Sequence, residues 1–193
     1  MTASYPGPLR HEPLAVELHN TLYAVRGAPV DGLETVAGLR SWIDGIANRL
    51  PVRARDVDLS RRAEFIALRT AARDALHAAN VGAPVPAAAL EVLNDAAARA
   101  PTSPRAVGRK RGRLGVESRY HAASATDIAL AAFAADAIEV IAGPDREHLR
   151  ACGAPGCVLL FVKDHPRRRW CSDACGNRAR QARHYDRKRR ARR

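Results

Sequence analysis

The sequence predicts a mainly α-helical chain with one small β-hairpin, divided into a helical N-terminal domain and a compact C-terminal module. Three observations carry this prediction. Apolar residues recur every three or four positions in several segments before residue 145, as they do on the buried face of a helix. All four cysteines lie within one stretch of 24 residues in the last quarter of the chain. The same region holds nearly all of the net charge of +12.

Charge is distributed unevenly between the two parts. Residues 146–193 contain fifteen Lys/Arg and four Asp/Glu, whereas residues 1–145 contain seventeen and sixteen. Such an asymmetry is typical of a terminal module that binds a polyanion, with nucleic acid as the first candidate and an anionic membrane surface as the second. The 193 residues have room for one ordinary domain and one small module, so we divide the chain into residues 1–145 and 146–193.

Apolar stripes at helical spacing mark five helices in the N-terminal domain. They cover residues 14–22, 33–49, 60–80, 86–97 and 124–141. Proline or glycine follows most of them, where helices commonly end. Ser124 and Asp127 form a capping-box-like start for the last helix. That helix is too short to cross a membrane and is interrupted by Asp136 and Glu139.

A segment rich in turn-forming residues and arginine separates the fourth and fifth helices. We expect a loop over residues 101–115, followed by a short strand over residues 116–120 that pairs with residues 106–109. The loop carries a basic patch, which is more typical of a solvated turn than of a second phosphate contact. Its members are Arg109, Lys110, Arg111 and Arg113. Residues 145–150 are expected to add a final helical turn or two before the first cysteine.

The four cysteines form two close pairs separated by thirteen residues. Cys152 and Cys157 are spaced C-x4-C, and Cys171 and Cys175 are spaced C-x3-C. Short spacing lets two thiolates of one pair reach the same ion, and the gap is long enough for a hairpin that brings the pairs together. The spacing therefore predicts one tetrahedral zinc per chain. The alternative is two disulfides or four unrelated thiols, which a chain with no secretion signal disfavours.

The residues between and after the cysteines fit a treble-clef-like zinc finger. Residues 158–162 alternate as a strand, residues 163–166 supply a turn, and residues 167–170 are expected to be the return strand. Ser172 is a good N-cap for a helix that places Cys175 at its third position, where the helix dipole favours a thiolate. Gly176 costs about 1 kcal/mol in a helix relative to alanine, so it indicates a close approach by a neighbouring group.

This C-terminal helix is expected to bind DNA. At 100° per residue, Ala179, Ala182 and Tyr185 face the metal, and Tyr185 joins Phe161 and Trp170 in the small core of the finger. The opposite face is basic and suits the major groove or the phosphates of a duplex. The predicted DNA-contacting residues are Arg178, Arg180, Arg183, Arg187, Lys188, Arg189 and Arg190.

The C-terminal module resembles the CGNR zinc finger of bacterial transcription regulators. The resemblance rests on the runs CGAPGC and RRRWCSDACGNR and on the basic helix after them; the name-giving tetrapeptide is Cys175-Gly176-Asn177-Arg178. In that family the finger follows a helical ligand-sensing domain called ABATE. LAVELHNTL from Leu14 and LRTAARDAL from Leu68 resemble its signatures, although Glu17 stands where the family more often has aspartate.

The resemblance implies that the N-terminal domain senses a small-molecule ligand. Glu17, Asn20 and Arg69 are the candidates for the pocket. From the residues alone, Glu17 and Asn20 are equally explained by ordinary helix polarity, and arginines beside an apolar stripe usually extend to solvent.

We interpret the chain as a cytoplasmic, nucleoid-associated DNA-binding transcription regulator that responds to a ligand or stress signal and is not an enzyme. A single finger buries little surface, so we expect a homodimer formed through the helical domain. Two alternatives remain. One is an HNH-like metal-dependent nuclease using Asp164, His165, Asn177 and His184, and the other is an RNA-binding factor.

Overall fold

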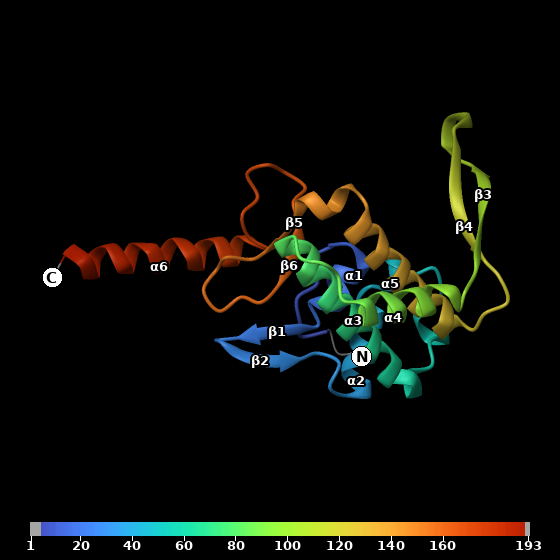
Figure 1. Cartoon of the computed structure of the whole chain (residues 1–193), viewed down its shortest axis with the longest axis horizontal. Helices are drawn as coiled ribbons and strands as arrows, with labels where there is room; N and C mark the ends of the chain where they lie inside the picture. Colours follow the sequence, from blue (N-terminus) through green and yellow to red (C-terminus); the bar gives the residue numbers. More distant parts are fainter. Residues whose placement is uncertain (1–4, 192–193) are drawn as a thin grey trace.

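The computed structural model describes residues 5–191, and helices make up most of its N-terminal part (Figure 1). Five α-helices occur before the cysteines: α1 (Leu14–His19), α2 (Val36–Gly45), α3 (Arg62–Val81), α4 (Ala87–Ala98) and α5 (Ala125–Ala142). Short 3-10 helices connect them: η1 (Ala47–Arg49), η2 (Ala54–Asp56), η3 (Leu59–Arg61), η4 (Lys110–Gly112) and η5 (Pro144–His148). The last helix, α6 (Asp173–Ala191), extends away from all of these.

Six short strands form three separate antiparallel pairs. They are β1 (Leu22–Val25) with β2 (Ala28–Asp31), β3 (Thr102–Gly108) with β4 (Leu114–Tyr120), and β5 (Leu149–Ala151) with β6 (Leu160–Val162). The mainly helical fold with small β-hairpins confirms the predicted fold class, and the four cysteines gather in its C-terminal part.

The apolar core lies where α3 and α5 meet the other N-terminal helices. The Trp42 and Phe133 rings stack with centroids 5.2 Å apart, and Phe65 meets Phe133 edge-on at 6.3 Å. All three rings are fully buried. Ser124 accepts a hydrogen bond from the Asp127 amide at the start of α5, which is the predicted cap.

The first helix is shorter than predicted because a β-hairpin follows it. The apolar spacing predicts a helix to Leu22, but α1 ends at His19, where the Thr21 hydroxyl donates to the Leu18 carbonyl at 2.7 Å. β1 and β2 then turn at Arg26 and Gly27, both with positive φ, as a two-residue hairpin turn requires. Leu22 therefore belongs to a strand and not to the helix.

The segment after α4 is a long hairpin and not a loop. Pairing runs over all seven residues of each strand, from Thr102 opposite Tyr120 to Gly108 opposite Leu114. The prediction of a loop over residues 101–115 is wrong for residues 102–108, and the predicted pairing of residues 106–109 with residues 116–120 covers only part of the ladder. This hairpin projects from the helical body (Figure 1).

The strand that pairs with β6 comes before the first cysteine. The helical turn predicted over residues 145–150 is present as η5 up to His148, but Leu149 then pairs with Val162 in a strand. The strand predicted over residues 167–170 is wrong, because these residues adopt no regular structure. Leu149 is fully buried, which anchors β5 on the core. The Arg168 side chain turns inward and donates to the Val162 carbonyl at 3.0 Å, so its segment folds over the end of β6.

None of the helices within residues 5–191 combines the length and the apolar character that crossing a bilayer requires.

Candidate metal centre and basic helix

Four cysteine side chains converge on one point between β5, β6 and α6. The Sγ atoms of Cys152, Cys157, Cys171 and Cys175 all lie within 4.8 Å of one another. Cys157 Sγ is 3.8 Å from Cys171 Sγ, which in turn is 3.5 Å from Cys175 Sγ. These distances are far longer than a disulfide bond of about 2.05 Å, so the disulfide alternative does not fit.

The cluster fits one zinc ion. Four ligands at a Zn–S distance of about 2.3 Å lie about 3.8 Å apart at the corners of a tetrahedron, close to the separations found here. Hydrogen bonding within the cluster lowers the pKa of the Cys152 thiol and raises the pKa of the Cys171 thiol. A bound cation favours the thiolate form of all four side chains. The predicted set of four zinc ligands is brought together as one site.

Local structure around the cluster also favours thiolates. Ser172 accepts a hydrogen bond from the Cys175 amide at 3.3 Å, which is the predicted helix cap. The Cys171 amide donates to Cys152 Sγ at 3.5 Å, and the Arg178 guanidinium donates to Cys175 Sγ at 3.1 Å. Four thiolates and one Zn²⁺ carry a net charge of −2, so Arg178 offsets part of it. Arg178, which the sequence predicts as a DNA-contacting residue, thus lies at the metal centre with its guanidinium on a ligand sulfur.

A tryptophan holds the start of α6. A methyl group at Gly176 would lie 3.1 Å from Trp170 Cε3, so the close approach predicted for this glycine is made by the indole ring. Arg180 and Arg183 sit over the same ring, with guanidinium carbons 5.7 Å and 5.9 Å from its centroid. Asn177 accepts a hydrogen bond from Arg180. Trp170 therefore orders two of the predicted DNA-contacting side chains.

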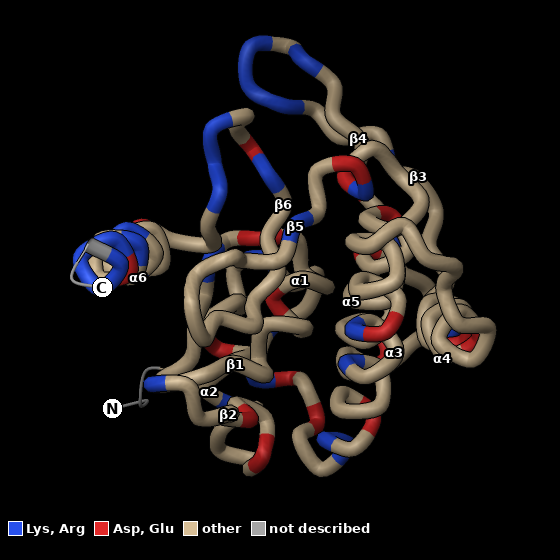
Figure 2. The backbone as a smooth tube through the Cα atoms, turned by 60° about the vertical axis from the view of Figure 1, so that its left-hand side comes forward, with Lys and Arg blue, Asp and Glu red and all other residues tan. Residues whose placement is uncertain are grey.

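Beyond its second turn, α6 stands free of the rest of the protein. Cys175 and Ala179 are buried and Ala182 is half-buried, but every residue from Arg183 to Arg190 is exposed. Tyr185 is 70% exposed, so its predicted place in the finger core is wrong: the helix extends past the module that it was expected to cover. The predicted DNA-contacting side chains of this part of α6 are all accessible, and Figure 2, which views the helix nearly end-on, shows its turns mostly in the colour of Lys and Arg.

The outer edge of β6 is capped by side chains of the N-terminal domain, which the sequence did not reveal. Asn20 donates to the Leu160 carbonyl and accepts from the Leu160 amide, both at 3.0 Å, as a neighbouring strand would. Two residues on, the Val162 amide donates to Glu12 at 2.9 Å, and Glu12 also pairs with Arg168. Burial raises the pKa of the Glu12 carboxyl group. The finger is therefore fastened to the N-terminal domain by hydrogen bonds.

The three predicted ligand-pocket residues are buried and occupied by partners within the protein. Glu17 accepts from the Arg10 and Glu12 amides at 2.9 Å, and Asn20 caps β6. Arg69 pairs with Asp31, including a contact of 2.8 Å, and thereby lowers the pKa of that carboxyl group. The structure places these residues in separate networks, and none of them lines the cavity next to the metal centre.

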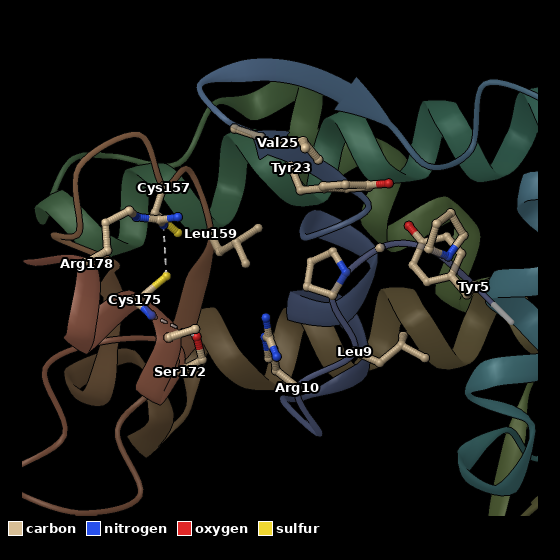
Figure 3. A pocket seen from close by; sticks show the side chains of 15 residues that line it. Tyr5, Leu9, Arg10, Tyr23, Val25, Cys157, Leu159, Ser172, Cys175 and Arg178 are labelled. Atoms are coloured by element: carbon tan, nitrogen blue, oxygen red, sulfur yellow. Dashed lines mark hydrogen bonds between the residues drawn. The ribbon is translucent and has the colours of Figure 1, made fainter.

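That cavity lies between the N-terminal segment, β1 and the finger (Figure 3). Its volume is about 490 Å³. Arg10 and Tyr23 line it from one side, and Leu159, Cys157 and Arg178 from the other. A molecule bound there would contact both parts of the chain.

His19 links the capped edge to α3. It is fully buried; its Nδ1 lies 3.0 Å from Asn20 Oδ1, and its Nε2 lies 3.1 Å from His77 Nε2 and 3.4 Å from Arg73. Because the Asn20 oxygen only accepts, these contacts assign the proton of the neutral ring to Nδ1. Burial, followed by the nearby Arg73 charge, lowers the pKa of His19 to about 3.

This lowered pKa predicts acid sensitivity. Below the ordinary histidine pKa of 6.5, His19 is protonated in the unfolded chain but stays neutral in the folded protein. The free energy of unfolding therefore falls as the pH drops from 6.5 toward about 3. We expect the free energy of unfolding of His19→Gln to fall less steeply, by up to about 1.4 kcal/mol per pH unit, between pH 6 and 4. Urea titrations of both proteins at several pH values measure this difference. Parallel pH profiles would contradict the assignment of His19 as neutral.

Comparison with protein families agrees with this geometry. Residues 12–144 match the ABATE family model, described as "Putative stress-induced transcription regulator", and residues 148–188 match the CGNR zinc finger. A comparison with curated protein sequences finds no match. The two family matches support a regulatory role, and the CGNR match together with the four converging cysteines assigns one zinc per chain. The chain belongs to the ABATE family and carries a CGNR zinc finger after its ABATE domain.

Proposed function

We propose that this protein is a DNA-binding transcription regulator in which α6 contacts duplex DNA and the N-terminal domain responds to a ligand or stress signal. The zinc centre anchors α6 through Cys175, and the N-terminal domain holds the finger through the edge of β6. We further propose that the protein acts by binding and not as an enzyme.

The observation that carries this proposal is the free, basic α6. Its 19 residues span about 28 Å at 1.5 Å per residue, enough to follow the major groove for most of one turn. Arg180, Arg183 and Arg187 follow one another along its exposed side, and Asp173 and Asp186 are its only acidic residues. A helix with so few acidic residues, whose side chains from Arg183 to Arg190 are all exposed, fits a polyanion better than it fits solvent alone.

Neutralising this helix tests the proposal. We expect Arg180→Gln/Arg183→Gln/Arg187→Gln to weaken binding to random-sequence duplex DNA. The slope of the logarithm of the binding constant against the logarithm of the salt concentration is negative. It should become less steep by about 0.9 for each phosphate that is no longer neutralised, so by up to about 2.7. Fluorescence anisotropy over a salt series measures both changes.

The matched control neutralises three exposed arginines elsewhere: Arg26→Gln/Arg53→Gln/Arg55→Gln. This control should bind DNA as the parent protein does. Equal losses of affinity in both triple variants would mean that overall charge, and not α6, holds the DNA. Tighter binding of structured RNA than of duplex DNA at matched salt would instead favour the RNA-binding alternative.

The geometry offers less to the nuclease alternative. His165 Nδ1 accepts from the Arg167 amide at 3.1 Å, and Asn177 accepts from Arg180, so both side chains serve local contacts. Within residues 5–191, the four cysteines are the group of His, Cys, Asp or Glu side chains placed to share a metal ion.

A ligand site in the N-terminal domain and a homodimer complete the proposed regulator. The ABATE match supports sensing, and the cavity between the N-terminal segment and the finger offers a space that touches both parts of the chain. A thermal-shift screen of small molecules against the full chain would test for a ligand. We propose a homodimer because one finger with one helix buries too little DNA surface for specific binding.

A further inference from the structure

The β3–β4 hairpin extends from the helical body as a free arm. Its tip is tight: Arg111 and Gly112 have φ of 63° and 68°, and the Arg109 amide donates to the Arg113 carbonyl at 2.7 Å. In Figure 1 the arm leaves the body on the side away from α6. The fold thus presents a second projecting element besides α6.

The arm concentrates the positive charge of the N-terminal domain. Residues 102–120 contain six Lys/Arg and one Asp/Glu, whereas the rest of residues 1–145 contains eleven and fifteen. The domain that looks almost neutral as a whole is therefore an acidic body with a basic arm. Four cations, Arg109, Lys110, Arg111 and Arg113, lie within five residues at the tip, and Figure 2 shows most of the tip in the colour of Lys and Arg.

Beyond its base, the arm is exposed to solvent within the part of the chain that the structure describes. Most residues of both strands are exposed, including Leu114 (81%) and Val116 (73%). The register puts these two on one face, opposite Gly108 and Ala106. An isolated two-stranded hairpin is marginally stable in water, so a long one with exposed apolar residues indicates a partner.

Charge decides between the partners that could cover this arm. A second copy of the arm would bring two surfaces of net charge +5 together, which like-charge repulsion opposes. A duplex offers phosphates to the tip, and β-ribbons enter DNA grooves in several proteins. Proteins that bind the minor groove wedge leucine and proline side chains between base steps; Leu114 and Pro104 are exposed on one face of the arm, next to Arg113 and Arg105.

We propose that the β3–β4 hairpin is a second DNA-contacting arm, whose basic tip binds the phosphates of the duplex that α6 contacts. This inference rests on the proposed function of α6. The basic loop after β6, with Arg167 and Arg169 exposed, reaches the same side of the molecule as the tip of the arm in both Figure 1 and Figure 2. It offers an intermediate point of contact between the two projecting elements.

The test neutralises the tip in the full zinc-loaded chain with Arg109→Gln/Lys110→Gln/Arg111→Gln/Arg113→Gln. With a random-sequence duplex of about 40 base pairs, the salt slope should fall by about 0.9 for each phosphate that the tip no longer neutralises, so by up to about 3.6, and affinity at low salt should fall at least tenfold. The α6 triple variant and the Arg26, Arg53 and Arg55 control are measured beside it. A second variant, in which Asn-Gly replaces residues 109–113, removes the tip while keeping a two-residue turn.

Each outcome has one meaning. Weaker, less salt-dependent binding by both tip variants and by the α6 variant supports the arm. If the tip variants bind DNA like the control while the α6 variant binds it more weakly, the proposed role of the arm is overturned and the proposed function of α6 stands. If none of them weakens binding, both proposals fail. If the tip variants keep DNA binding but change the mass of the protein in analytical ultracentrifugation, the arm joins copies of this chain and the proposal is overturned.

Discussion

Cys175→Ser is expected to abolish zinc binding and with it DNA binding. Cys175 is a buried ligand on α6, within 3.5 Å of Cys171 Sγ, so its loss opens the metal site and frees the start of the helix. Structural zinc sites of this kind contribute on the order of 10 kcal/mol to folding. The small core around the cysteines, with Phe161 and Trp170, is too small to replace that contribution. Elemental analysis should find one zinc in the parent protein and none in the variant.

Val158→Ser is the matched control for this experiment. It introduces serine into the same zinc finger at Val158, which is 48% exposed and is not a metal ligand. Zinc content and DNA affinity should therefore stay unchanged. A Cys175→Ser protein that kept both one zinc and full DNA affinity would show that the four cysteines do not act as one site. Removing zinc from the parent with a chelator should reproduce the variant.

Asn20→Ala is expected to loosen the finger from the N-terminal domain without touching the metal ligands. It leaves the Leu160 amide and carbonyl unpaired in a fully buried position. Unpaired buried groups cost about 1–3 kcal/mol each, so the loss of both should lower the free energy of unfolding by about 2–6 kcal/mol. Chemical denaturation measures the loss, and hydrogen exchange should show faster exchange of the β6 amides.

The exposed Asn94→Ala on α4 is the control, since it removes the same amide from a solvated helix face. It should change stability by no more than about 0.5 kcal/mol. Asn20→Asp separates the two hydrogen bonds, because a carboxylate still accepts from the Leu160 amide but cannot donate to its carbonyl. Equal stability of the Asn20→Ala and Asn94→Ala proteins would contradict the capped edge.

Features set by short spacing could be predicted from the sequence. The cysteine pairs, the Ser172 cap, the close approach at Gly176 and the basic stripe of α6 each depend on residues within a few positions of one another. Most of the helices of the N-terminal domain follow from apolar periodicity in the same way.

Features that depend on distant residues could not be predicted. Asn20 and Leu160 are 140 positions apart, and no local pattern signals that an amide will cap a strand edge. Local sequence places Arg168 in a return strand, because its ion pair with the distant Glu12 has no local signal. The prediction for Tyr185 is wrong because a helical projection assumes that a core lies along the whole helix. α6 instead extends beyond the zinc finger, and Tyr185 is exposed. The division at residues 145 and 146 stays a prediction.

The capped edge of β6 limits how freely the zinc finger can be exchanged between proteins. The two family matches meet between residues 144 and 148, which invites treating the parts as exchangeable modules. Yet the finger's strand is completed by side chains of the preceding domain, at Asn20 and Glu12, and its partner strand β5 is anchored on that domain's core. A finger transplanted to another domain would lose two partner residues and the three hydrogen bonds that they make with β6. The border that separates two families in sequence thus crosses a single folded unit in space.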